Sequence, residues 1–337
     1  MPPEPHPLIE IKDLQISFPL EERTVSVVHD ISLTLPRGRT IGLVGESGCG
    51  KSMTGLSLLQ LIPPPGKIAC GQILFCPDAN STPIDIAQLL PKGDAIRAIR
   101  GKEIAMIFQE PMSSLNPVYT IGQQISEMVL LHTGKNKREA HEHAIEMLKK
   151  VGIPAPELRV NDFPHQLSGG MRQRAMIAMA LSCNPNLLIA DEPTTALDVT
   201  VQAQIIDLMR DLQEEFGMSI LLISHDLGVI ADIAEEIVVM YAGRVVEQGS
   251  ADSIFYSPQH PYTQGLLKSI PVLGNRSQEP LYSIPGTVPS PLAMPKGCAF
   301  RPRCLERKAE CTTLPLLKPH ASGALVRCWA REEVTNG

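Results

Sequence analysis

Apolar and polar positions are patterned differently in successive parts of the chain. Between residues 8 and 45 they tend to alternate, and they do so cleanly at Ile31, Leu33 and Leu35. Successive side chains of a strand point to opposite faces of a sheet, so this alternation predicts antiparallel strands with one buried face. The chain is therefore expected to begin with a small antiparallel sheet.

Four short runs are apolar throughout and have no polar face. This pattern is typical of strands that are covered on both faces of a parallel sheet. The runs predict buried strands at residues 40–44, 104–108, 187–190 and 220–223. Residues 237–249 predict a hairpin that turns at Ala242-Gly243.

Residues 120–182 have the spacing of helices instead. Apolar side chains recur three and four positions apart between Ala144 and Val151, Asn136 is a suitable N-cap, and Gly152 can end that helix. Helices combined with buried parallel strands predict an α/β fold.

Prolines and glycines interrupt two other parts of the chain. Residues 63–93 are expected to be rich in loops. Eight prolines between residues 258 and 295 break up any long element. We therefore expect residues 255–337 to form a loop-rich C-terminal extension.

Composition restricts the classes of function. The 337 residues carry a net charge of −6 and only 4% aromatic side chains, which argues against a general nucleic-acid binder. No stretch approaches the ~18 apolar residues of a membrane span, and residues 1–7 lack the pattern of a signal peptide. We expect a cytosolic chain, which needs membrane-spanning partners if it works at a membrane.

The residues after the first buried strand carry the clearest chemistry. They read GESGCGKS, which fits the phosphate-binding loop G-x-x-x-x-G-K-[ST], and a helix is expected to follow. The glycines let backbone N–H groups turn towards phosphates, and the helix N-terminus adds partial positive charge. The candidate residues for binding a nucleoside triphosphate are Gly45, Glu46, Ser47, Gly48, Cys49, Gly50, Lys51 and Ser52. Lys51 is expected to reach the β- and γ-phosphates and the Ser52 hydroxyl to hold Mg²⁺.

A second buried strand, residues 187–190, ends in two carboxylates. Mg²⁺ prefers hard oxygen ligands, so Asp191 is placed to orient the ion directly or through water. Glu192 is placed to polarise an attacking water beyond the γ-phosphate, as a general base.

A serine and two glycines open a predicted helix further along the chain. They belong to the run Leu167-Ser168-Gly169-Gly170-Met171. Such a helix start can simply be capped, or it can bind an anion. Because the phosphate-binding loop already accounts for one nucleotide, an anion site at this helix start would need another ligand.

Four of the eight cysteines crowd the end of the chain. They are Cys298, Cys304, Cys311 and Cys328. In a reducing cytosol, such a group indicates a metal or cluster site rather than disulfides. Its spacing is wider than that of most structural zinc sites, and four thiolates can also hold a 4Fe–4S cluster. Zinc and free thiols remain alternatives.

The order and spacing of these motifs resemble the ATP-binding subunit of ATP-binding cassette (ABC) transporters over roughly residues 8–250. Gly45–Ser52 resemble its Walker A motif, Leu167–Met171 its signature with Met171 in place of the usual glutamine, and Leu187–Glu192 its Walker B motif. The resemblance implies a P-loop NTPase (RecA-like) cassette with an antiparallel β subdomain.

The resemblance also implies the domain boundaries. Residues 1–254 would form the nucleotide-binding domain, with an inserted helical subdomain at about residues 110–182. Residues 255–337 would form the extension.

The same resemblance implies further site residues. Gln109, just before Glu110-Pro111, matches the Q-loop glutamine that contacts Mg²⁺. His225 matches the switch histidine that contacts the γ-phosphate, and Leu197-Asp198 match the D-loop. Phe18 matches the aromatic residue that stacks on adenine.

The family mechanism implies a paired ATPase. Two cassettes would hold two ATP molecules between them, so Ser168 and Gly170 would contact the γ-phosphate bound by the partner subunit. Hydrolysis would then open the pair.

A narrower resemblance concerns the extension. His260–Leu267, Pro285–Pro289 and Gly297–Cys304 are similar to segments of dipeptide and oligopeptide importers, specifically the dipeptide-type "D" subunit. Some relatives import nickel or glutathione instead. This likeness implies a second ATPase subunit, usually a paralogue, two transmembrane permeases, an extracytoplasmic peptide-binding protein, and a place on the cytoplasmic face of the inner membrane. It also implies a 4Fe–4S cluster at the four cysteines.

Two rival interpretations remain open. One is a soluble ABC ATPase that acts on nucleic acid or ribosomes, against which the acidic charge and single cassette argue. The other is an iron–sulfur redox protein with a vestigial cassette, which the presence of Lys51, Glu192 and His225 disfavours.

Overall fold

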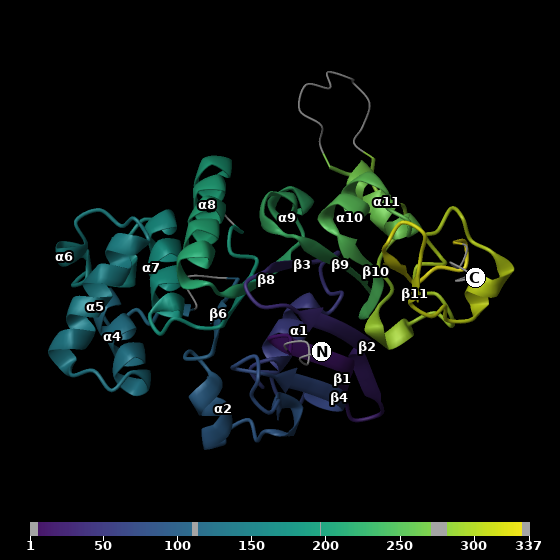
Figure 1. Cartoon of the computed structure of the whole chain (residues 1–337). Coiled ribbons are helices and arrows are strands. Elements are labelled where there is room, and N and C mark those ends of the chain that lie inside the picture. The colour runs from purple at the N-terminus through teal and green to yellow at the C-terminus, as the bar shows by residue number, and fades with distance from the viewer. Residues whose placement is uncertain (1–5, 110–113, 196, 271–281, 332–337) are drawn as a thin grey trace.

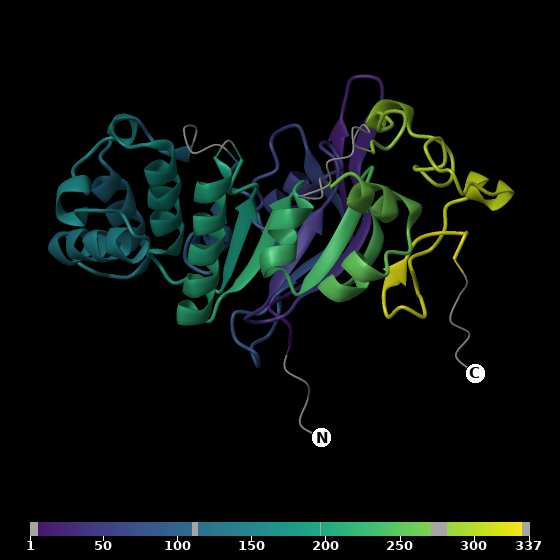
Figure 2. The ribbon, with the colours of Figure 1, turned by 90° about the horizontal axis from the view of Figure 1, so that it is seen from above.

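A computed structural model describes residues 6–109, 114–195, 197–270 and 282–331. Two sheets occupy the middle of the molecule, with a lobe of helices α4 to α7 at one end and the C-terminal extension at the other (Figures 1 and 2). The Q-loop residues Glu110-Pro111 and the prolines at 271 and 280 lie outside the described residues.

The described residues form both strands and helices. The strands are β1 Ile9–Pro19, β2 Thr24–Leu35, β3 Thr40–Val44, β4 Lys67–Phe75, β5 Ile84–Asp85, β6 Ile104–Ile107, β7 Leu187–Asp191, β8 Ser219–Ser224, β9 Glu236–Tyr241, β10 Arg244–Ser250, β11 Lys318–Pro319 and β12 Leu325–Val326. The helices are α1 Lys51–Ser57, α2 Asp94–Ile99, α4 Ile121–His132, α5 Lys137–Lys150, α6 Pro156–Arg159, α7 Gly169–Leu181, α8 Val199–Phe216, α9 Leu227–Ile233, α10 Ala251–Tyr256 and α11 Pro261–Lys268.

The larger sheet has eight strands in the order β11-β12-β10-β9-β3-β8-β7-β6. The five strands from β9 to β6 are parallel to one another, and β10, β12 and β11 continue the sheet in antiparallel fashion. Every residue of β3, β7 and β8 is buried, which confirms the prediction from their unbroken apolar runs. Because these strands run in parallel, the residues that follow β3, β6, β7 and β8 meet at one edge of the sheet.

The smaller sheet is antiparallel, in the order β2-β1-β4-β5. The alternating residues of β2 pair with β1, for example Leu33 opposite Ile11, and pack with Leu43 and Val238 of the larger sheet in one apolar core. The predicted antiparallel start is confirmed. The expectation that residues 63–93 are rich in loops holds for only part of this stretch, because β4 occupies Lys67–Phe75 and pairs with β1.

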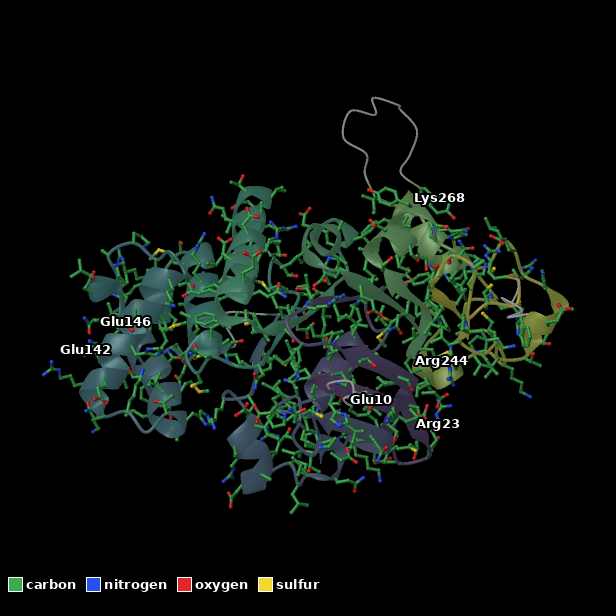
Figure 3. The ribbon with its side chains drawn as sticks, viewed as in Figure 1. Glu10, Arg23, Glu142, Glu146, Arg244 and Lys268 are labelled. Atoms are coloured by element: carbon green, nitrogen blue, oxygen red, sulfur yellow. The ribbon has the colours of Figure 1, made fainter. Side chains whose placement is uncertain are left out.

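The helical lobe contains α4, α5, α6 and α7, as the spacing of residues 120–182 predicted. Asn136 accepts hydrogen bonds from the N–H groups of Arg138 and Glu139 and caps α5, so the predicted N-cap is confirmed. Glu142 and Glu146 of α5 lie at the outer side of the lobe (Figure 3). On α5, Ala140, Ala144, Met147 and Leu148 are buried.

The C-terminal extension packs on the cassette instead of forming a separate core. Its strand β12 pairs with β10, and Tyr262 and Phe300 are buried in the same apolar cluster as the parallel strands. Arg23, labelled in Figure 3 near the extension, donates a hydrogen bond to the Leu292 carbonyl at 3.0 Å. The extension is therefore in contact with both sheets.

Candidate functional site

A cavity of about 500 Å³ opens where the parallel strands end. Its lining includes residues that follow β3, β6, β7 and β8, which is where the topology brings such residues together. The lining residues are Val44, Gly45, Glu46, Ser47, Gln109, Glu192, Thr195, His225, Leu227 and Leu266. The structure thus brings the phosphate-binding loop together with Gln109, Glu192 and His225, which come from distant parts of the chain.

The loop between β3 and α1 has the backbone that its glycines permit. Gly50 adopts φ +99°, a left-handed conformation that residues with a side chain rarely adopt. At Gly45 a Cβ atom would lie 2.2 Å from the carbonyl oxygen of Met240, so a larger residue does not fit. Lys51 is buried and its Nζ donates to the carbonyl oxygens of Gly45 at 2.7 Å and Glu46 at 3.2 Å. The loop therefore curls around its own lysine.

The side chains of Ser52 and Asp191 lie close together and can offer oxygen ligands to a metal ion. The Ser52 hydroxyl donates to Asp191 Oδ1 at 3.1 Å. Burial raises the pKa of Asp191, the hydrogen bond from Ser52 acts against this rise, and the neighbouring charge of Glu192 adds to it. A buried carboxylate with a raised pKa gains from a nearby cation, and hydroxyl and carboxylate oxygens are ligands that Mg²⁺ accepts.

Glu192 receives contacts from three sides. Gln109 Nε2 donates to Oε2 at 2.8 Å, and His225 Nδ1 lies 3.0 Å from Oε1. The Thr195 hydroxyl also donates to Oε2, at 3.0 Å. Burial acts to raise the pKa of Glu192, but the hydrogen bonds from His225 and Thr195, together with the charges of His225 and Lys51, lower it overall. The side chain is thus held as a carboxylate, the form that can accept a proton.

The backbone of Glu192 is unusual as well. It adopts φ +48°, in the left-handed region that is uncommon for residues other than glycine. Its N–H donates to the Ile223 carbonyl at the end of β8, at 2.8 Å. This bond fixes the turn that directs the carboxylate away from its strand.

Sequence reasoning did not find Thr195. The available signal is its position three residues after Glu192, in a turn closed by the Thr195 N–H and the Glu192 carbonyl at 3.2 Å. A hydroxyl so close in sequence to a carboxylate can hydrogen-bond it locally.

The predicted signature residues lie on α7 and its N-terminus. Ser168 caps the helix by accepting a hydrogen bond from the Met171 N–H at 3.3 Å. Leu167 is buried, Met171 is partly buried against the core, and Gly170 faces Val201 of α8. None of them is among the described residues that line the cavity.

The predicted D-loop lies at the start of α8. The Asp198 carboxylate accepts a hydrogen bond from the Val201 N–H at 3.0 Å and so caps that helix. Leu197 packs against the main core.

Phe18 lies in β1, and its ring packs against Ile62 and the turn at Gly66. It is not among the described residues that line the cavity. Its role beside adenine stays a prediction.

The four cysteines of the extension are free thiols. Within the described ranges, no group of three or more His, Cys, Asp or Glu side chains could hold a metal ion, so the arrangement does not support the expected cluster or the zinc alternative. Burial raises the pKa of Cys304 to about 11, and it raises the pKa of Cys298 and Cys328 as well.

Among the residues that the structure describes, no helix combines the length and the apolar character needed to cross a bilayer.

Comparison with known families gives two matches. Residues 28–195 match the model described as "ABC transporter". Residues 246–311 match the model described as "Oligopeptide/dipeptide transporter, C-terminal region". The second match covers the part of the extension that contains α11 and the first three of the four cysteines.

Curated relatives match over most of the chain. The chain is 52% identical over 304 residues to a putative peptide import ATP-binding protein of Brucella melitensis, covering 88% of this chain and 89% of the relative. It is 48% identical over 328 residues to the oligopeptide transport ATP-binding protein AppD of Bacillus subtilis, covering 97% of each. The protein named OppD of Salmonella typhimurium is 46% identical over 322 residues, which are 96% of this chain and 93% of the relative.

Solved structures share the fold of the cassette. The dimeric post-hydrolysis state of the ATP-binding cassette MJ0796, bound to ADP and Pi, aligns with a TM-score of 0.63 at 27% identity. The alignment covers 72% of this chain and 98% of that one.

Proposed function

The chain belongs to the ABC transporter family of ATP-binding proteins, and on this premise we propose that it is the ATP-hydrolysing subunit of a bacterial importer for dipeptides or oligopeptides. The observation that carries the ATPase assignment is the contact of Glu192 with Gln109 and His225 in the same cavity as the phosphate-binding loop. The match of residues 246–311 to an oligopeptide/dipeptide transporter region supports the substrate class.

The loop between β3 and α1 binds ATP. Its backbone N–H groups surround the phosphates, and the buried Lys51 exchanges its loop carbonyls for the β- and γ-phosphate oxygens. Ser52 and Asp191 would hold Mg²⁺, with Gln109 as a further oxygen ligand, and the ion would neutralise charge that develops on the phosphates. Phe18 is proposed to stack on the adenine.

Glu192 accepts the proton of the attacking water. Gln109 and Thr195 fix its position through Oε2, and His225 lies on the other carboxylate oxygen, next to where the γ-phosphate would bind. Positioning and charge stabilisation supply most of the rate in phosphoryl transfer.

The signature residues act on a second subunit. Ser168 and Gly170 lie outside the cavity of their own chain, so they are available to the ATP held by a partner. The dimeric cassette structure of MJ0796, which is bound to ADP and Pi, supports such a pair. We propose that the partner is a paralogous ATPase, that Leu197-Asp198 border the contact, and that residues 1–254 form the cassette and residues 255–337 the extension.

Two permeases and an extracytoplasmic binding protein complete the proposed importer, with this subunit on the cytoplasmic face of the inner membrane. The match to an oligopeptide/dipeptide transporter region does not favour nickel or glutathione as the substrate. Action on nucleic acid is disfavoured by the net charge of −6.

Uptake in the source bacterium tests the substrate. Deletion of the gene should abolish accumulation of a radiolabelled dipeptide or oligopeptide, and wild-type protein should restore it. Glu192→Gln protein at the same abundance should not restore it. Unchanged peptide uptake together with lost nickel or glutathione uptake would contradict the peptide assignment, and a salt-sensitive gel shift with DNA would favour the nucleic-acid alternative.

We further propose an iron–sulfur cluster at the four cysteines of the extension, although the described side chains form no group that could hold a metal ion. Besides burial, the charges of Cys298, Cys311 and Cys328 raise the pKa of Cys304, which supports their proximity. In a 4Fe–4S cluster each thiolate binds a different iron, so the sulfurs stand farther apart than around one ion. Backbone N–H groups of Lys308 and Ala330 approach the sulfurs of Cys311 and Cys328 at 3.4 Å, a kind of contact that tunes such clusters.

Anaerobic purification tests the cluster. We expect brown protein that contains about four iron and four sulfide ions per chain. Colourless protein with one zinc per chain, or with neither metal, would contradict the proposal.

A further inference from the structure

The C-terminal extension reaches the phosphate-binding loop directly. Arg303, the residue before Cys304, forms an ion pair with Glu46, the second residue of the loop. Its Nη1 lies 2.7 Å from Glu46 Oε2 and its Nη2 3.0 Å from Oε1, so the pair is bidentate. The same loop residue donates its backbone N–H to the Tyr262 hydroxyl oxygen at 2.8 Å.

Arg303 has no hydrogen-bonding capacity left for another ligand. Only 4% of its side chain is exposed, and besides Glu46 it donates to Tyr241 and to the carbonyls of Ile284 and Pro285. These bonds account for all five N–H groups of a guanidinium. The side chain is therefore a fixed positive charge, and among the described residues its carboxylate partner is Glu46 of the phosphate-binding loop.

Tyr262 is equally constrained. It is fully buried, and its ring packs against Tyr241 at 4.6 Å and Phe300 at 5.4 Å between centroids. Because the ring cannot move without disturbing this cluster, its hydroxyl oxygen is a fixed acceptor for the Glu46 N–H.

We propose that Arg303 and Tyr262 are positioning residues for ATP binding, which hold Glu46 in place and cancel its charge beside the site of the terminal phosphate. Glu46 lines the cavity together with Glu192 and His225. An unpaired carboxylate there would repel the triphosphate, and the repulsion would be strongest for the phosphate nearest to it. The inference rests on the proposed function in taking ATP as the ligand.

Nucleotide binding by the purified full-length chain tests the inference. Arg303→Gln should raise the Kd for the non-hydrolysable ATP analogue AMP-PNP about tenfold, and the Kd for ADP by less than about threefold. If the ion pair only stabilised the fold, its removal would raise the Kd for both nucleotides by the same factor. Equal factors would therefore overturn the inference.

The second part of the test removes the charge of Glu46, which Arg303→Gln leaves unpaired. Adding Glu46→Gln to Arg303→Gln should restore AMP-PNP affinity to within about threefold of wild type, because neither the charge nor its repulsion remains. Arg303→Lys keeps the charge and should retain most of the affinity despite losing the bidentate geometry. Failure of both variants to recover binding would overturn the inference.

Arg331 offers a matched control in the same extension. Its Nη1 lies 2.6 Å from Glu306 Oε2, away from the loop, and Arg331→Gln should leave both Kd values unchanged. Tyr262→Phe removes the acceptor of the Glu46 N–H from the packed cluster and should raise the Kd for AMP-PNP about threefold, with a smaller effect on the Kd for ADP. If it does not, the role of Tyr262 is wrong.

Absence of nucleotide binding by the wild-type chain would overturn the proposed function itself, whereas wild-type binding with an unaffected Arg303→Gln variant would overturn only the inference.

Discussion

Glu192 combines a local conformational cost with a precise set of contacts. Its positive φ turns the side chain away from β7, and the contacts with Gln109, Thr195 and His225 compensate by fixing the carboxylate. The lowered pKa keeps it ionised over the neutral range. A single residue thus gathers groups from three strand ends.

Glu192→Gln should reduce the rate of ATP hydrolysis at least about a hundredfold, because an amide cannot accept the proton from water. ATP binding should be retained. Phosphate release and equilibrium nucleotide binding measure the two effects. Glu235→Gln, which removes a half-exposed carboxylate paired with Arg39, should leave both unchanged. Normal hydrolysis by Glu192→Gln would exclude this residue as the base.

Asp191 affects stability through its raised pKa. Below the ordinary carboxyl value of 3.8 it is protonated in both the folded and the unfolded chain and costs nothing. As the pH rises through its folded pKa, the unfolded chain loses the proton more readily, so the native state loses stability. Asp191→Asn should therefore raise the melting temperature of the nucleotide-free protein at pH 7 but not at pH 3, in thermal scans by circular dichroism. An equal gain at both values would contradict this cause.

At the scale of elements, side-chain caps begin both α5 and α7 of the helical lobe, but we assign the two caps different roles. Asn136 and Ser168 both accept backbone N–H groups at the first turns of α5 and α7. Asn136 faces solvent and has a capping role only. Ser168 is proposed to contact the partner's ATP in addition.

Asn136→Ala and Ser168→Ala should each destabilise the protein by about 1 kcal/mol through loss of the cap. Only Ser168→Ala should also lower the ATPase rate of the assembled transporter. Urea unfolding and phosphate release separate the two effects, and Asn136→Ala is the matched control. Equal ATPase rates in the two variants would contradict the signature assignment.

The elements that could be predicted from sequence are those with strong local signals. Unbroken apolar runs identified β3, β6, β7 and β8, and capping chemistry identified α5. The strand β4 was missed because its first half is mostly exposed and Gly71 interrupts it at φ +95°. The two-residue strands β11 and β12 carry too few residues to show any periodicity.

The same distinction holds within the site. The phosphate-binding loop and the carboxylates after β7 follow from contiguous motifs, whose geometry is fixed by a strand and a loop. The pair between Glu46 and Arg303 joins residues 257 positions apart, and no local pattern indicates such a contact. Long-range polar contacts depend on the packing of the whole chain.

At the scale of the whole molecule, the extension and the cassette share one core. Phe300 is 4% exposed and meets the Tyr241 ring edge-on at 5.2 Å, so a residue of the extension packs on the last parallel strand. Arg327 of the extension donates to the Val245 carbonyl of β10 at 2.8 Å. Stability and nucleotide binding therefore depend on both parts.

Phe300→Ala should destabilise the whole protein by about 3–5 kcal/mol, because it leaves a cavity between the extension and the cassette. Trp329→Ala in the same extension, where 38% of the residue is exposed, should cost much less. Thermal unfolding followed by circular dichroism should show one transition, lowered by Phe300→Ala. Separate transitions for the two parts would contradict the shared core.

The contact of Arg303 with Glu46 also limits how such subunits can be recombined. If the extension were replaced by that of a paralogue without this arginine, the charge of Glu46 would be left unpaired. If the cassette were replaced by one with a neutral residue at the position of Glu46, the charge of Arg303 would be left unpaired. Chimeras that exchange tails should consequently keep working only when both residues move together, which makes the pair a compatibility test between halves of different transporters.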